Sequence, residues 1–182
     1  MNRQHNSADS THDKLEGMEA REKIRELIEK TSLCFFVTRT SYPGSTNARP
    51  MMVQEIDDEG NLWFISSADS HKDQELNNNP EVYLYFQSSG GGEFLEVLGR
   101  ASVCRDQQRI EQLWKPEFNA WFERGKEDPK VSLIKVVPHE GHFWDTEHGG
   151  LTAGVRSIFS NFFMQKPEYA ASEGHLQPQR GV

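Results

Sequence analysis

Two basic residues and several hydroxyl side chains stand where they could bind one phosphate group. Arg49 opens an apolar run of strand length, and Ser66 and Ser67 close the next one. Ser70 is a good helix N-cap, so Lys72 falls in the first turn of a helix, whose positive end disfavours a cation. A lysine suits that position when an anion lies between it and the exposed N–H groups. The spacing therefore predicts that Arg49 and Lys72 together clamp a phosphate.

A hairpin and a short helix would place these residues. The apolar runs predict strands over 49–56 and 62–65. The turn between them contains Gly60 and Asn61, which can adopt the positive φ that a hairpin requires. The helix begins after Ser70. A hairpin followed by a helix is also common in proteins that bind nothing there. When no ligand is bound, the side chains of Arg49 and Lys72 are expected to be solvated. Their removal should therefore hardly affect folding.

Four short sequences follow one another between Arg49 and Pro80, in the order R-P-M-M-V-Q, W-F-I-S-S, S-H-K and N-N-N-P. This order resembles the FMN-binding segment of the pyridoxamine phosphate oxidase-like split-barrel flavoproteins, most of all their general stress protein branch. Two later stretches, LWKPEFNAWFERGKEDP and GHFWD, are similar to the same branch. The resemblance covers residues 18–145. It implies a mainly β fold with flanking helices, an antiparallel Greek-key split β-barrel, and a homodimer with FMN at the subunit interface.

The resemblance also implies which residues contact FMN. Arg49 and Lys72 would hold the phosphate with hydroxyl groups nearby, and the backbone of 51–53 would face the isoalloxazine ring. Two tryptophans are candidate walls of the flavin site. The predicted cofactor-binding residues are Arg49, Met51, Met52, Val53, Ile65, Ser66, Ser67, His71, Lys72, Trp121 and Trp144.

The chain departs from the oxidase pattern at several positions. His71 stands where the oxidase has an arginine, so one phosphate cation would be only partly charged at neutral pH. Gln54 replaces a lysine after the apolar triplet, and Phe94 replaces a flavin-contacting glutamine. The oxidase's C-terminal substrate motif, with its Arg and His, has no counterpart in 151–182. Oxidation of pyridoxamine phosphate itself is therefore not expected.

Two features of the predicted barrel have more than one interpretation. Aromatic residues gather at Trp114, Trp121, Phe122 and Trp144. Packing in the core or between subunits is the more common role of such residues, and a wall against a flavin ring is the alternative. Pro50 removes a ladder donor from a predicted strand. It implies an edge strand, a bulge, or backbone groups turned toward a ligand.

Composition and single residue types limit the other classes of function. The 182-residue chain has a formal net charge of −8 and no basic stripe, which argues against a nucleic-acid partner. Cys34 and Cys104 lie in strand-like runs, which favours small buried hydrophobes over a disulfide. His139, His142 and His148 match no zinc motif, so no metal site is predicted. No apolar run is long enough to span a bilayer and no signal-peptide core is present, so a cytoplasmic protein is expected.

The sequence divides into four parts. Residues 1–16 and 165–182 are polar and are predicted to be disordered tails. Residues 17–145 form the split-barrel domain, which opens with an amphipathic helix over 18–30. Residues 146–164 carry an apolar stripe at helical spacing. This stripe predicts a helical extension that packs on the barrel or on a partner, and a membrane surface is the alternative.

Two classes of function fit these expectations. In the first, the protein is an oxidoreductase in which FMN carries out the redox chemistry and the protein supplies position and electrostatics. In the second, it binds FMN without turnover and stores or senses it in a stress response. A split barrel that uses haem or a deazaflavin is a further alternative. No catalytic acid or base stands out, so no catalytic residue is predicted.

Overall fold

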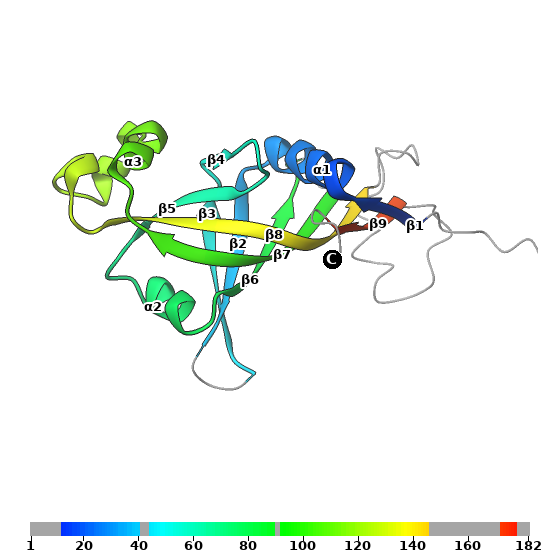
Figure 1. Ribbon diagram of the computed structural model, residues 1–182, viewed down its shortest axis with the longest axis horizontal. Coiled ribbons are helices and arrows are strands. Elements are labelled where there is room, and N and C mark those ends of the chain that lie inside the picture. Colours follow the sequence, from blue (N-terminus) through cyan, green and yellow to red (C-terminus); the bar gives the residue numbers. More distant parts are fainter. Residues whose placement is uncertain (1–11, 41–43, 90–91, 146–171, 178–182) are drawn as a thin grey trace, which may run out of the picture.

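The computed structural model describes residues 12–40, 44–89, 92–145 and 172–177 (Figure 1). The elements in chain order are β1 (His12–Glu16), α1 (Gly17–Lys30), β2 (Leu33–Arg39), β3 (Thr46–Met52), β4 (Glu55–Ile56), β5 (Leu62–Ser67), α2 (His71–Asn78), β6 (Glu81–Gln87), β7 (Glu93–Cys104), α3 (Gln107–Leu113), the short 3-10 helices η1 (Pro116–Ala120) and η2 (Gly125–Glu127), β8 (Val131–Asp145) and β9 (Ser172–Gln177).

The strands form one sheet that curls into a split barrel. The order across the barrel is β3, β2, β6, β7 and β8, and β8 also pairs with β5, which pairs with β4. The chain runs from β3 almost directly into β4. Here the Val53 N–H donates to the Ser32 carbonyl at 2.8 Å. One residue later, the Gln54 N–H donates to the Trp63 carbonyl, also at 2.8 Å. This short segment therefore bonds to both ends of the curled sheet.

The connectivity is a Greek key. β2 pairs with β3 on one side, and the chain then passes through β4, β5 and α2 before β6 pairs with the other side of β2. The return of a later strand to lie beside the first is typical of this arrangement. Every pair within the barrel is antiparallel. The predicted mainly β split barrel with flanking helices is confirmed.

Alternate residues of the strands fill the barrel interior, as the two-residue period of a strand requires. Phe36 of β2 and Phe64 of β5 are fully buried and meet edge to face, with ring centres 5.3 Å apart. Helix α1 turns its apolar stripe onto the same core. The buried residues of that stripe are Ala20, Ile24, Leu27 and Ile28.

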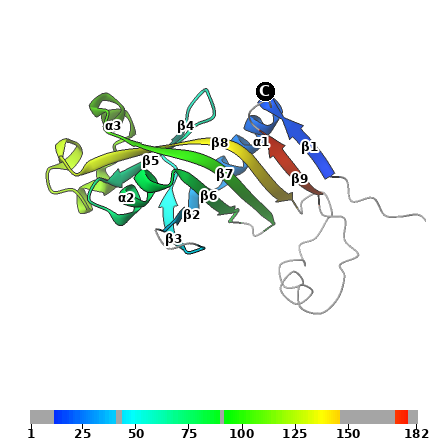
Figure 2. The same cartoon turned by 60° about the horizontal axis from the view of Figure 1, so that its bottom comes forward.

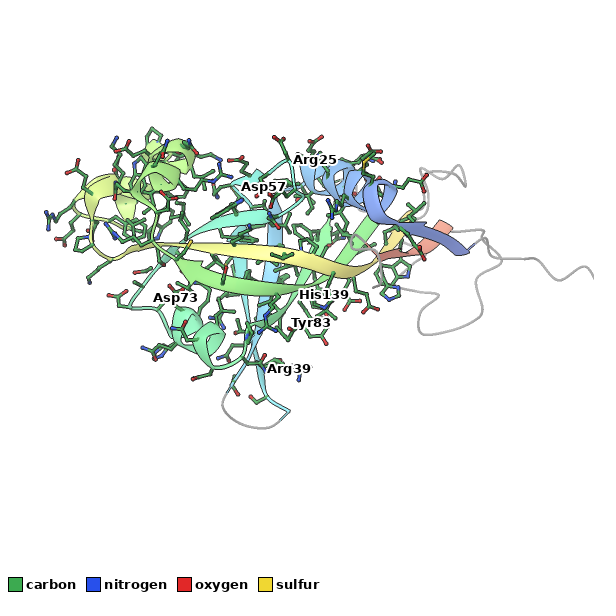
Figure 3. All side chains as sticks on the ribbon, viewed as in Figure 1. Arg25, Arg39, Asp57, Asp73, Tyr83 and His139 are labelled. Carbon is green, nitrogen blue, oxygen red and sulfur yellow. The ribbon has the colours of Figure 1, made fainter. Side chains whose placement is uncertain are left out.

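Two basic residues tie α1 to the barrel. Arg25 donates to the carbonyl oxygens of Ile56 and Asp57 at 3.0 and 2.6 Å, which fixes the helix to the β4–β5 hairpin (Figure 3). Lys30 in the last turn pairs with Glu93, a buried carboxylate at the start of β7. The helix is thus held near its middle and at its C-terminal end by charged contacts as well as by its apolar stripe.

A second apolar cluster lies outside the barrel, between β8 and the α3 region at one end of the molecule (Figure 2). Its buried members are Ile110, Leu113, Phe122, Val131 and Leu133. Asp106 caps α3 by accepting a hydrogen bond from the Arg109 N–H at 3.1 Å. No helix among the described residues has the length and apolar content needed to cross a bilayer.

The hairpin turn differs in part from the prediction, and the position of Pro50 is one of the predicted alternatives. Gly60 has the positive φ predicted for the hairpin, at 84°, but Asn61 does not. Asn61 instead faces back to Asp57, which accepts from both its backbone N–H and its side chain at 2.9 Å. Among the described strands β3 pairs with β2 alone, so Pro50 lies in an edge strand, where its missing N–H leaves no gap in the middle of a sheet.

The ends of the chain differ from the predicted tails. Residues 12–16 and 172–177 form β1 and β9, which pair in parallel, and β9 also pairs antiparallel with residues 141–145 of β8. Neither segment has enough apolar residues to form a core alone, but an exposed strand end can satisfy the backbone groups of a polar strand. The predicted helix over 146–164 lies outside the described residues.

The two cysteines fit their predicted role as small hydrophobic residues. Cys34 is buried in the barrel core, where burial raises the pKa of its thiol to about 12. Cys104 is partly buried beside the second cluster, and both thiols are free.

Candidate phosphate-binding site

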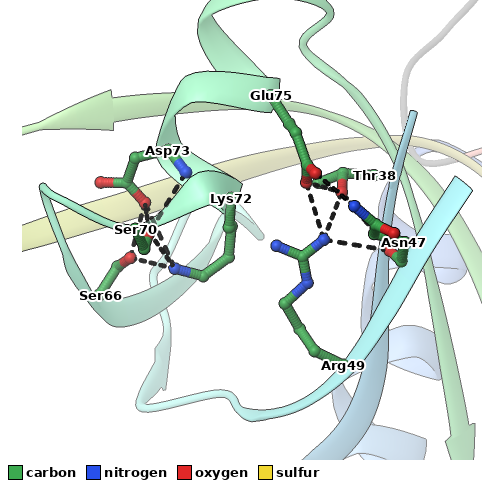
Figure 4. Close-up of polar contacts among 8 residues, drawn as sticks. All are labelled: Thr38, Asn47, Arg49, Ser66, Ser70, Lys72, Asp73 and Glu75. Atoms are coloured by element: carbon green, nitrogen blue, oxygen red, sulfur yellow. Dashed lines mark hydrogen bonds and ion pairs between the residues drawn. The ribbon is translucent and has the colours of Figure 1, made fainter. Parts of the chain in front are cut away.

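Arg49 and Lys72 come together, as their spacing predicts. Arg49 projects from the edge strand β3 and Lys72 from the first turn of α2, and their side chains enter the same space between strand and helix (Figure 4). Burial lowers the pKa of Lys72 below its ordinary 10.5, and the positive charge of Arg49 adds to this lowering, while Asp73 opposes it. The two cations are therefore near enough to repel each other.

Lys72 is part of a buried polar network. The residue is only 8% exposed. Its Nζ donates to Ser66 Oγ, to Ser70 Oγ at 3.1 Å and to Asp73 Oδ1 at 3.3 Å. An ammonium group has three N–H bonds, so these three contacts use all of them. The expectation that Lys72 would be solvated is wrong, because the acidic residue beside it in sequence points inward and the lysine follows it.

Asp73 is the centre of that network. It is almost fully buried and accepts hydrogen bonds at 2.7 Å from Ser66 on β5 and Ser132 on β8. Ser70 caps the helix by accepting a bond from the Asp73 backbone N–H at 3.3 Å, and its hydroxyl donates to the carboxylate at 3.1 Å. The carboxylate of Asp73 thus joins the start of α2 to β5 and β8. Because Lys72 also bonds to this network, its side chain is held in one position.

Arg49 has a different environment. Its side chain is 24% exposed. Only Nη2 is bonded: it donates to Thr38 Oγ1 at 2.8 Å, to Glu75 Oε2 at 2.7 Å and to the Asn47 carbonyl at 3.3 Å. Nη1 and Nε make no hydrogen bond with any residue that the structure describes. These two nitrogens remain available to an anion, and Nη1 lies on the side of Lys72 (Figure 4).

Glu75 balances Arg49 from one turn further along α2. Its carboxylate accepts from Thr38 at 2.5 Å, from Asn47 Nδ2 and from Arg49. Burial raises the pKa of Glu75, but these hydrogen bonds and the charge of Arg49 outweigh it, so the pKa lies below the ordinary 4.5. Glu75 is therefore ionised at neutral pH. With Lys72 paired to Asp73, the four charged groups of the site sum to zero.

The other predicted contacts at the helix start are near the site but are not all free. Ser67 donates to Asp69 at 2.5 Å, and Asp69 also pairs with Lys130 at 3.0 Å. His71 is exposed in the first turn of α2. Both residues therefore lie near the N-terminal end of α2, which is the end that carries Lys72.

The apolar residues predicted to face a flavin have mixed positions. Val53 is buried in the barrel core, and its backbone N–H is already bonded to Ser32. Ile65 packs on the second cluster, and Met51 packs partly against the core. Met52 is exposed on the edge strand. Within one chain, Met52 is therefore the side chain of this group most accessible to a ligand.

The two tryptophans are not brought together with the phosphate site. Trp121 follows η1 and is 72% exposed, and Trp144 lies near the other end of β8 and is 38% exposed. Ser132, which contacts the site, is twelve residues before Trp144 on the same strand. At about 3.3 Å per residue, the fully extended strand between them would be at most about 40 Å long. Trp144 therefore lies near the opposite end of β8 from the phosphate site.

Four residues of the site were not predicted from the sequence. Thr38, Asn47 and Glu75 surround Arg49, and Ser132 completes the Asp73 network. The position of Glu75 three residues after Lys72, on the same helix face, was a signal that could have identified it. Ser132 carried no such signal, because its contact depends on the pairing of β5 with β8.

A fifth unpredicted feature is an orphaned acceptor next to the exposed methionine. Gln54 Nε2 donates to the Met52 carbonyl at 2.9 Å. The other end of the amide, Oε1, is buried and has no hydrogen-bond partner among the described residues. A buried acceptor without a partner costs about 1–3 kcal/mol, so a donor that reached it would be favoured.

Exposed apolar side chains cover the outer face beside the edge strand. Phe35 is 58% exposed, and it lies opposite Tyr85 on one side and Pro50 on the other. Leu33 and Met52 form the next pair along and are exposed on the same face. A group of exposed large hydrophobic residues on three neighbouring strands is typical of a protein interface.

The comparisons with known proteins agree with this architecture. The family described as pyridoxamine 5'-phosphate oxidase like matches residues 19–168. A curated relative, general stress protein 26 of Bacillus subtilis (strain 168), is 28% identical over 82 residues, which make up 43% of this chain and 58% of the relative. The chain thus spans less than two thirds of the length of that relative.

Two solved structures share the fold. The general stress protein 26 of Bacillus anthracis str. Sterne is 25% identical with a TM-score of 0.60, covering 69% of this chain and 94% of that one. The general stress FMN/FAD binding protein of Xanthomonas citri is 28% identical with a TM-score of 0.61, covering 75% and 94%. The predicted resemblance is confirmed, and the chain belongs to the pyridoxamine 5'-phosphate oxidase-like family, with general stress protein 26 among its relatives.

Proposed function

We propose that this protein binds FMN, with the phosphate held between Arg49 and Lys72. The observation that carries the proposal is the half-satisfied guanidinium of Arg49, whose Nη1 and Nε have no partner among the described residues while a second cation lies beside it. Charge-assisted bonds to a phosphate are among the strongest hydrogen bonds in proteins. The related protein of Xanthomonas citri, described as FMN/FAD binding, supports the same ligand class.

The residues around this pair suit the rest of the cofactor. The start of α2 offers backbone N–H groups to an anion. At the end of β3 and in the link to β4, the exposed Met52 and the orphaned Gln54 Oε1 offer an apolar contact and an acceptor to a ring that carries an N–H group. When bound, FMN would supply one- and two-electron redox chemistry. The protein's own part would be to hold the phosphate, to orient the ring and to exclude water from one side of it.

We extend the proposal to a homodimer in which the second subunit completes the flavin site. The exposed face of Leu33, Phe35, Met52 and Tyr85 adjoins the strand that carries Arg49. Within one chain, neither predicted tryptophan reaches that strand. A second copy docked on this face would cover the apolar side chains, and it could bring an aromatic wall to the ring.

We further propose an oxidoreductase whose substrate is a small molecule, with storage or sensing of FMN as the second candidate. The inward network of Lys72 and Asp73 favours neither, because all of its polar groups already bond to one another. The two candidates differ in a simple assay: reduction of the bound flavin by NADH or NADPH, followed by its reoxidation, is expected for the oxidoreductase and not for the binding protein.

Calorimetric titration of FMN and riboflavin tests the phosphate assignment. Wild-type protein should bind FMN more tightly than riboflavin. Arg49→Ala should weaken FMN binding by about 1.5–3 kcal/mol, which is roughly ten- to more than a hundredfold, and should leave riboflavin unchanged. Arg100→Ala removes an exposed arginine that pairs only with Glu81 among the described residues, and is the matched control. Equal affinity of wild-type protein for both ligands, or a monomeric mass by light scattering with one FMN per chain, would contradict the proposal.

A further inference from the structure

Glu75 occupies the part of Arg49 that a phosphate would use best. An arginine binds a phosphate most strongly through two parallel N–H groups. A guanidinium has two edges with two parallel N–H groups, one formed by Nη1 and Nη2 and the other by Nε and Nη2. The third edge, between Nε and Nη1, is blocked by Cδ. Nη2 therefore belongs to both usable edges. Nη2 is the nitrogen that donates to Glu75 at 2.7 Å, to Thr38 at 2.8 Å and to the Asn47 carbonyl at 3.3 Å.

Glu75 is also held in place independently of Arg49. Thr38 donates to it at 2.5 Å from β2, and Asn47 donates to it from β3. The side chain is only 12% exposed. The carboxylate therefore stays beside Arg49 when a ligand approaches, and it does so as an anion, because its pKa is lowered by those hydrogen bonds despite its burial.

We propose that Glu75 is a specificity-determining residue that limits the affinity of the phosphate site and keeps FMN exchangeable. It does so in two ways. It keeps Nη2 bonded, so that the phosphate can contact Arg49 through Nη1 but not through two parallel N–H groups. It also places a second negative charge beside Arg49, in addition to the charge of the phosphate. This inference rests on the proposed function, since it concerns the same phosphate. Glu75 would thus weaken phosphate binding, whereas Lys72, one turn earlier on α2, would strengthen it.

The charges of the site support this direction of effect. Arg49 and Lys72 provide two positive charges, and Glu75 and Asp73 cancel both. Asp73 is fixed inside the network by three hydroxyl groups and turns away from Arg49. Glu75 is thus the carboxylate whose removal would give the phosphate side of the site a net positive charge without breaking any hydrogen bond of Lys72.

Glu75→Gln tests the inference. It keeps an acceptor for Arg49 and removes the charge. We expect FMN to bind about two- to fivefold more tightly than to wild type, which corresponds to the upper part of the range of about 0.2–1 kcal/mol measured for partly exposed charge pairs. Riboflavin binding should not change. The gain for FMN should shrink as sodium chloride is raised from low to high concentration, because it is electrostatic. Glu111→Gln, the same change on α3, is the control and should leave both affinities unchanged.

Each outcome decides between explanations. If wild-type protein binds FMN and riboflavin equally, the proposed function fails. If wild type prefers FMN but Glu75→Gln binds it equally or more weakly, the proposed function stands and Glu75 has no limiting role, or only orients Arg49. Should Glu75→Gln not fold, Glu75→Asp keeps a carboxylate for Thr38 and Asn47 and shortens its reach to Arg49. It should then show a smaller gain in the same direction, and a loss would overturn the inference.

Discussion

The two cations of the candidate site differ in how much of each is committed to the fold. Lys72 is buried, and its Nζ donates all three of its N–H groups to Ser66, Ser70 and Asp73. Arg49 lies at a sheet edge and has two of its three nitrogens unbonded to any described residue. One cation is therefore mainly structural and provides a fixed positive field, and the other can form new bonds with a ligand.

This difference follows from where the partner of each cation points. Asp73 is drawn inward by Ser132 of β8, so its lysine is buried with it. Glu75 is held by β2 and β3 at the sheet edge, where it is partly buried, so its arginine stays at that edge and remains partly exposed. Removing Lys72 should therefore damage the fold first, whereas removing Arg49 should damage ligand binding first.

The largest effect is expected for Lys72→Met, measured as the free energy of unfolding in urea. The change leaves Asp73 buried without a countercharge, which costs about 3–5 kcal/mol at a fully buried pair. The three hydroxyl groups that still donate to Asp73 reduce this cost, so we expect a loss of about 2–3 kcal/mol. Lys126→Ala, which removes an exposed partner of Glu111, is the control and should unfold like wild type. An equally small loss in both variants would mean that Lys72 is not built into the fold.

A smaller loss is expected for Arg49→Ala in the same unfolding experiment. Glu75 keeps Thr38 and Asn47 as donors after the change, so no buried group is left without a partner. The lost ion pair is partly exposed, and such pairs contribute about 0.2–1 kcal/mol. If Arg49→Ala proved as destabilising as Lys72→Met, the contrast between the two cations would not hold.

The smallest effect is expected at acid pH and concerns Glu75. Its folded pKa lies below the ordinary 4.5, so the unfolded chain binds more protons in this range. The stability that Glu75 contributes is therefore fully present above pH 4.5, and is lost as pH falls through the folded pKa. Urea unfolding between pH 3 and 6 should show a shallower acid decline in Glu75→Gln than in wild type, by less than about 1 kcal/mol. Parallel curves would indicate that the contacts of Glu75 with Thr38, Arg49 and Asn47 do not lower its pKa in solution.

The sequence predicted the barrel elements that depend on local pattern. β2 at Leu33–Arg39 and β6 at Glu81–Gln87 alternate buried and more exposed residues, and such a pattern in the sequence fixes both the conformation and the buried face of a strand. Ser70 caps α2 as predicted, because an N-cap bond involves residues of one turn. The family pattern also located the candidate phosphate site on β3 and α2.

The prediction was incomplete where distant segments meet. β8 runs from Val131 to Asp145, since β5 and β7 supply pairing partners along its first part and β7 and β9 along its last part. The predicted tails at 1–16 and 165–182 contain β1 and β9, which exist only as a pair on the end of β8. Such polar strands show no apolar alternation in the sequence, because they depend on backbone pairing with a strand that is distant along the chain.

By itself, the amino-acid sequence determined that this chain is β-rich and has a basic pair beside a hairpin and a helix, since strand alternation, turn residues and caps act within a few positions. The barrel was implied by the family resemblance. Only the tertiary structure decided how the two basic residues differ. Ser132 is 59 residues from Asp73, and Thr38 is 37 residues from Glu75. These long-range hydrogen bonds set which carboxylate turns inward, and a charged side chain follows its partner because an unpaired charge cannot be buried without a large cost in free energy.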